Sequence, residues 1–167
     1  MKKALFILVA VVFSMLIAQT MSAQPATATQ TVTFQVNAVY KISTSGDPNP
    51  LTISDGVAGT DNLNSVSDNS TTYSITQNFA NTVKITANLD AALPAGYTLL
   101  VNLASSKGSS AGAVNISSAT PGSALNVVTA INRGADAGRT IEYTFGATAA
   151  AGPLASTTRD VTLTLTN

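Results

Sequence analysis

The sequence predicts an all-β protein, and three observations support this prediction. The chain is rich in Thr, Ser, Asn, Ala and Val and poor in Glu, Lys and Arg, a composition that favours pleated strands over surface helices. Apolar and polar residues alternate with a period of two in several runs. Clusters of Gly, Pro, Asn, Asp and Ser separate these runs, as turns require. Many short alternating runs divided by turn residues are typical of a β-sandwich.

The first 23 residues have the pattern of a secretory signal peptide. Lys2 and Lys3 precede an apolar run over residues 4–18, which is interrupted only by Ser14. A run of about fifteen residues is short for a helix that crosses a bilayer, but it suits the apolar part of a signal peptide. A retained membrane anchor is the alternative interpretation.

Cleavage after Ala23 is the expected processing step, and cleavage after Ala28 is the alternative. The first site leaves residues 24–167, which are enough for a single domain with its own core. Removal of Lys2 and Lys3 leaves six basic residues against eight acidic ones, a net charge of about −2. Such a domain has no basic surface for nucleic acid or for an anionic membrane, so neither is an expected partner.

The longest alternating run begins the exported part and spans residues 31–43. Its apolar members are Val32, Phe34, Val36, Ala38, Tyr40 and Ile42. A long strand at the edge of a sheet exposes unpaired N–H and C=O groups, which can extend the sheet of a neighbouring subunit. Pairing of residues 31–42 with another copy of the chain is therefore one hypothesis. Pairing of this strand within its own sandwich is the other, and it is the commoner arrangement of strands.

The remaining expected strands complete an immunoglobulin-like sandwich of seven to nine antiparallel strands. They cover residues 82–90, 97–103, 113–117, 125–131, 140–147 and 159–166, with weaker candidates at residues 51–53 and 72–76. Residues 82–90 and 97–103 flank a turn that contains Pro94 and Gly96, so we expect them to form a hairpin. No second domain is expected.

The inventory of reactive side chains argues against an enzyme. The chain has no His, no Cys and only one Glu. A Ser-His-Asp triad, a Cys nucleophile and an imidazole or thiolate metal site are therefore impossible. We expect no catalytic residue, no cofactor and no bound metal. The absence of Cys also excludes disulfides and a lipid anchor attached through cysteine.

Two groups of residues have both a structural and a binding interpretation. Residues 47–69 hold four Asp and several Asn, which suit turns and could also offer oxygen ligands to calcium. We favour turns. Three of the tyrosines (Tyr40, Tyr97 and Tyr143) fall on the apolar phase of their strands, so we expect them in the core rather than on a sugar-binding surface.

Two stretches of the chain give it a resemblance to known proteins. The first runs from Tyr73 to Leu99 and includes Leu93-Pro94-Ala95-Gly96, and the second runs from Ala150 to Thr166. They resemble a group of small secreted bacterial proteins of undetermined role. More distantly, the plan is similar to spore-coat-U-type and other pilus-subunit sandwiches. The resemblance implies a structural role.

The expected function is that of a non-catalytic structural protein outside the bacterial cytoplasm. In this hypothesis the subunit self-associates through an edge strand, as in a pilus or filament. The rival hypothesis is a soluble module that binds a ligand such as a glycan through the loops at residues 43–70 and 105–112. The pattern does not distinguish the periplasm, the cell surface and the extracellular space.

Overall fold

The computed structural model describes residues 25–167, and the predicted signal peptide lies outside this range. The chain divides into two compact units, Met1–Gln35 and Val36–Asn167. Residues 25–35 of the first unit are exposed and belong to no strand. The second unit contains nine strands: β1 (Tyr40–Thr44), β2 (Val66–Gln77), β3 (Val83–Leu89), β4 (Tyr97–Leu103), β5 (Ser109–Ser110), β6 (Val114–Asn115), β7 (Leu125–Ile131), β8 (Gly134–Ala147) and β9 (Val161–Thr166).

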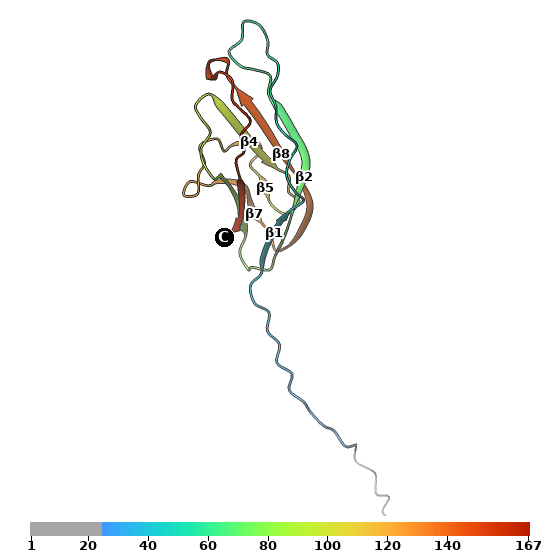
Figure 1. Ribbon diagram of the computed structural model, residues 1–167. Coiled ribbons are helices and arrows are strands. Elements are labelled where there is room, and N and C mark those ends of the chain that lie inside the picture. The colour runs from blue at the N-terminus through green and yellow to red at the C-terminus, as the bar shows by residue number, and fades with distance from the viewer. Residues whose placement is uncertain (1–24) are drawn as a thin grey trace, which may run out of the picture. The chain divides into compact units, whose positions relative to one another are not determined.

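The nine strands form two antiparallel sheets that pack face to face, which confirms the predicted β-sandwich (Figure 1). One sheet has the order β1-β2-β8-β4-β6, and the other has the order β5-β7-β3-β9. Apart from strands, the described residues form only a short 3₁₀ turn, Ala149–Ala151, after β8. No helix among residues 25–167 is long and apolar enough to cross a membrane.

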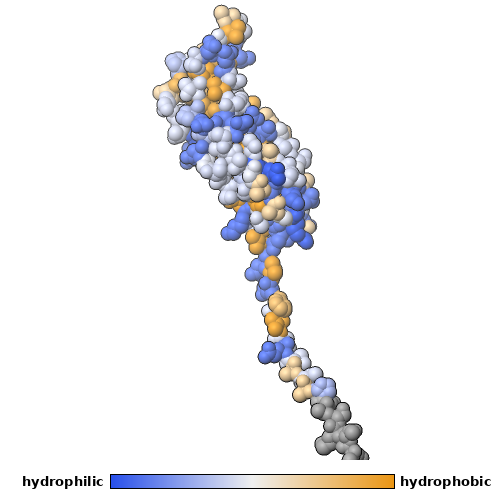
Figure 2. Space-filling model, turned by 90° about the vertical axis from the view of Figure 1, so that its right-hand side faces the viewer, coloured by the Kyte–Doolittle hydropathy of each residue, from blue (hydrophilic) through white to orange (hydrophobic). Residues whose placement is uncertain are grey.

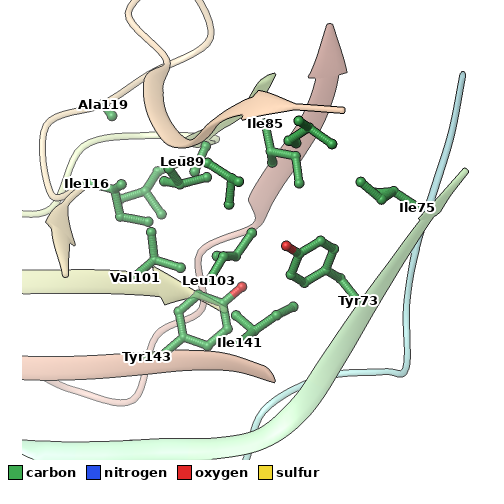
Figure 3. Close-up of a cluster of buried hydrophobic side chains, with 14 of the residues drawn as sticks. Tyr73, Ile75, Ile85, Leu89, Val101, Leu103, Ile116, Ala119, Ile141 and Tyr143 are labelled. Atoms are coloured by element: carbon green, nitrogen blue, oxygen red, sulfur yellow. The ribbon is translucent and has the colours of Figure 1, made fainter. Parts of the chain in front are cut away.

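The core lies between the two sheets and consists of the inward side chains of the alternating runs (Figure 3). β3 illustrates the pattern, because Val83, Ile85 and Ala87 are buried while Lys84 and Thr86 lie on the half-exposed face. Tyrosines contribute from the facing sheet. Tyr73 is 1% exposed, and its hydroxyl donates a hydrogen bond to the carbonyl of Ala104 at 2.7 Å.

The expectation that tyrosines belong to the core is confirmed for two of the three. Tyr97 and Tyr143 are buried, and the ring of Tyr97 stacks on that of Phe145 with 6.2 Å between their centroids. Tyr40 is half-buried and packs against Phe79. These rings therefore stabilise the sandwich and form no exposed aromatic platform.

The predicted hairpin of residues 82–90 and 97–103 is wrong, although both runs are strands. β3 has β7 on one side and β9 on the other, so it has no free edge for β4. The chain instead crosses to the opposite sheet, where β4 pairs with β8 and β6. The turn itself is present, with Gly96 at a φ of 87°. A Cβ atom on Gly96 would lie 2.7 Å from the Cβ of Ala151, so a side chain does not fit there.

The first expected strand, residues 31–43, is much shorter than its alternation suggests. Pairing with β2 begins only where Tyr40 meets Gln77, the last residue of β2. The chain that follows β2 leaves the sheet at the next residue, Asn78. The side chain of Asn78 accepts a hydrogen bond from the backbone N–H of Val39 and donates one to the carbonyl of Asn37. Residues before Tyr40 therefore lie outside the ladder between β1 and β2.

Other differences concern weaker patterns. Residues 51–53 form no strand, although Leu51 packs against the core. β8 begins at Gly134, six residues before the expected start at residue 140, and β2 extends well beyond residues 72–76. The two-residue strand β5 lies in a segment that was expected to be a loop. The immunoglobulin-like arrangement of the strands stays a prediction.

Candidate functional site

The most unusual surface feature among the described residues is a row of exposed apolar side chains. Val32 is 63% exposed, Phe34 is 87% exposed and Val36 is 85% exposed. They occupy every second position, and the residues between them are polar. In Figure 2 the narrow segment that contains these residues carries both orange, hydrophobic atoms and blue, hydrophilic ones. Full burial of a side chain such as Phe or Val contributes about 1.5–3 kcal/mol. Burial of these three side chains against a partner would therefore contribute to the free energy of binding.

Residues 31–36 have the side-chain period of a strand but belong to no strand of the structure. Of the predicted pairing segment 31–42, the last three residues lie in β1 and pair with β2 of the same chain. Pairing of this segment with another copy stays a prediction, and the structure places its three most exposed large apolar side chains at Val32, Phe34 and Val36.

The loops proposed for ligand binding do not come together. The tip of the first loop lies at the end of β8, where Leu63 donates to the carbonyl of Ala147 and Ala149 donates to that of Asp61. Residues 105–108 lie at the start of β8, beside Asp136. The fourteen residues of β8 separate these two regions.

The first loop borders an open hollow of about 530 Å³. It is lined by Ile53, Ser54, Asp55, Gly56, Leu63, Ala149, Gly152 and Pro153. The carboxylate of Asp55 already accepts hydrogen bonds from the N–H of Gly56 at 2.8 Å and from the side chain of Asn64 at 3.2 Å. The hollow has no aromatic ring in its lining, and this combination gives little basis for the recognition of a sugar.

Two acidic residues of the segment 47–69 have hydrogen-bond partners within the chain. Asp55 lies in the loop before β2, and Asp68 lies inside β2, next to a shift in its register with β8. Asp68 accepts hydrogen bonds from the side chains of Asn49 and Ser70, both at 2.7 Å. The bond from Ser70 lowers the pKa of Asp68 most, and the bond from Asn49 lowers it further. Between residues 25 and 167, no three acidic side chains gather in a way that could hold a metal ion.

A buried carboxylate that the sequence analysis missed lies at the start of β8. The side chain of Asp136 is fully buried and accepts hydrogen bonds from Ser105 Oγ at 3.0 Å, from the N–H of Ser106 at 2.8 Å and from Ser106 Oγ at 2.8 Å. Arg139 forms an ion pair with the same carboxylate. These contacts attach the loop of residues 105–108 to β8. The sequence signal was weak, because Asp136 lies between Ala and Gly residues that are typical of a loop.

The surroundings of Asp136 determine its pKa. Desolvation of the carboxylate raises the pKa, but the hydrogen bonds from Ser106, Arg139 and Ser105 outweigh this effect and lower it from 3.8 to about 2. All of these donors belong to the protein itself, so the hydrogen-bonding capacity of the Asp136 carboxylate is used within the chain. The cluster therefore stabilises the fold rather than binding a ligand.

The low pKa of Asp136 predicts a loss of stability in acid. The Asp136 carboxyl binds its proton less tightly in the folded state than in the unfolded chain. The stabilisation that the ionised carboxylate contributes to the fold is therefore present above pH 3.8 and is lost as the pH falls through about 2. A difference of this size corresponds to about 2 kcal/mol in the free energy of unfolding. Urea unfolding at a series of pH values should show this loss in the wild-type chain and a flatter profile in Asp136→Asn. The exposed Asp47→Asn variant is the matched control, and an acid profile unchanged by Asp136→Asn would contradict the assignment.

Comparison of the chain with protein-family models and with curated protein sequences finds no match. The similarity to pilus-subunit sandwiches therefore stays a prediction. The functional interpretation depends on the chemistry of the chain itself, in which Val32, Phe34 and Val36 are exposed apolar side chains outside the strands of the two sheets.

Proposed function

We propose that this chain is an exported, non-catalytic structural protein of a bacterium that self-associates by strand addition. Residues 31–36 of one copy are the donated strand. The observation that supports the proposal is the alternation of three strongly exposed apolar side chains, Val32, Phe34 and Val36, in a segment that belongs to no strand. A sheet edge that accepts such a segment gains backbone hydrogen bonds and covers its apolar face.

The composition of the segment supports the same role. Residues 25–40 contain no charged side chain, so insertion into a sheet edge buries no unpaired charge. Natural proteins usually protect exposed strands with Lys, Pro or bulges, and residues 31–36 contain neither Lys nor Pro. Export is part of the proposal, because the predicted signal peptide would place the chain where surface structures assemble.

The proposal is tested by the size of the chain that begins at Gln24. Light scattering over a range of concentrations should show oligomers that grow with concentration, and negative-stain microscopy should show ordered filaments. A monomer of about the chain mass at every concentration would overturn the proposal. Monomers that also bind on a glycan array would support the rival function of a soluble binding module.

A further inference from the structure

The two sheets of the sandwich have four edge strands, and three of them offer little room to an added strand. β5 and β6 are only two residues long. β1 has five residues and presents the exposed Lys41 at its second position, a charge of the kind that discourages pairing. β9 is different. It has six residues, Val161–Thr166, and none of them is charged.

β9 also has a regular, unprotected edge. Its pairing with β3 is continuous over all six residues and contains no bulge. On its other side, β9 forms no ladder with any strand among residues 25–167. A long, regular and uncharged edge of this kind is a template for another strand.

The side chains of β9 are incompletely covered. Val161, Leu163 and Leu165 point toward the core and pack against it, yet each is only partly buried. Thr162 and Thr164, on the opposite face, are exposed. A strand placed beside β9 would cover the three apolar side chains if it presented apolar residues with the same period of two.

The segment 31–36 has this pattern and this length. It contains six residues, as β9 does, and its apolar positions alternate with Thr31, Thr33 and Gln35. We propose that residues 31–36 of one copy add to the outer edge of β9 in a second copy. This inference rests on the proposed function and identifies the acceptor for the donated strand. Because donor and acceptor are different surfaces, repetition of the contact from copy to copy can build a chain of subunits.

The outer edge of β9, the proposed acceptor, has a neighbouring strand in the other sheet, and no backbone ladder joins the two. β1 lies beside β9 where the edges of the two sheets approach each other, but no ladder connects them. An incoming strand therefore has to displace β1 from its place beside β9, but it breaks no ladder between them. The new ladder to β9 and the burial of Phe34 and its neighbours offset that loss.

Cysteine cross-linking tests the acceptor, since the natural chain has no Cys. Residues 31–36 can run antiparallel or parallel to β9. In either direction, when their apolar side chains face the core, one of their outward-facing side chains lies opposite Thr164. In the antiparallel alignment that side chain is Thr33, and in the parallel alignment it is Gln35. Full exported chains that carry the single substitution Thr164→Cys are mixed with chains that carry Thr33→Cys or Gln35→Cys. Every product is then an inter-chain disulfide, which mass spectrometry can assign.

The matched control replaces Thr164→Cys by Ser109→Cys on β5, the other edge of the same sheet.

We expect one of the two mixtures to form the mixed disulfide about a hundredfold faster than the control mixture, because the bound segment has a high local concentration at β9. Equal rates for the test and control mixtures would overturn the inference. So would Thr164→Cys chains that link to each other faster than to the segment, which would indicate pairing of β9 with β9. If filaments form without the mixed disulfide, the acceptor is wrong and the proposed function stands. If the chain remains monomeric, both fail.

Discussion

Replacement of Val32, Phe34 and Val36 by serine in one chain will leave the sandwich folded and prevent its assembly. All three side chains are more than half exposed, so the folded subunit loses little when they become polar. In the assembly, each of them would be covered by the neighbouring subunit. Loss of even half of the gain from their burial amounts to about 3 kcal/mol, which weakens association by about a hundredfold. Light scattering measures the assembly, and circular dichroism with urea unfolding measures the fold.

The matched control changes the other face of the same segment. Thr31→Ser and Thr33→Ser in one chain alter outward positions that need no apolar cover, so assembly should change little. Assembly of the triple serine variant at wild-type concentrations would show that these apolar side chains are not the contact. An unfolded triple variant would show that they belong to the core of the subunit instead.

Ile85→Ala will destabilise the subunit by about 2–5 kcal/mol, the usual cost when a large buried side chain leaves a cavity. Ile85 is 0% exposed and lies in β3, which is paired on both sides and lies inside its sheet. The surrounding side chains come from both sheets, so the site cannot collapse by the movement of one loop (Figure 3). The free energy of unfolding in urea measures the effect.

Lys84→Ala is the control for this substitution, because Lys84 directly precedes Ile85 in β3 and lies on the outer, half-exposed face of the strand. We expect a change within about 0.5 kcal/mol for such a surface position. A loss of less than about 1 kcal/mol in Ile85→Ala would contradict the position of Ile85 in a closely packed core.

The elements that could be predicted from the sequence are those with a regular alternation and clear turn residues at both ends. Residues 82–90, 97–103 and 159–166 were expected as strands and correspond closely to β3, β4 and β9. In each case the alternation indicates a face that packs on the core, and the core confirms it. The number of strands agrees with the expected seven to nine, although residues 51–53 form no strand and β5 was not expected.

The partners of the strands could not be predicted, because alternation shows which face is buried and not which strand lies beside it. β3 and β4 are close in sequence yet lie in different sheets, since both edges of β3 are occupied. The start of β8 was missed because Gly134, Gly138 and the alanines near them have small side chains and show no period.

The role of the candidate segment stays a prediction, and the extent of the strand that contains it was predicted wrongly. The alternation of residues 31–43 is broken only at Val39, so sequence alone indicates one long strand. The structure divides it at Tyr40, where β2 reaches its last paired residue. The choice of β9 as acceptor needed the fold, since only the sheet order shows which strand has a free, uncharged edge.

Backbone hydrogen exchange of residues 31–36 tests the central claim most directly. A strand that joins a sheet places its N–H groups in a ladder, and such groups exchange slowly. In assembled wild-type protein, alternate amides of this segment should be protected, whereas in the dispersed triple serine variant they should exchange as fast as in an unstructured peptide. Fast exchange of all six residues inside intact assemblies would contradict strand donation by this segment.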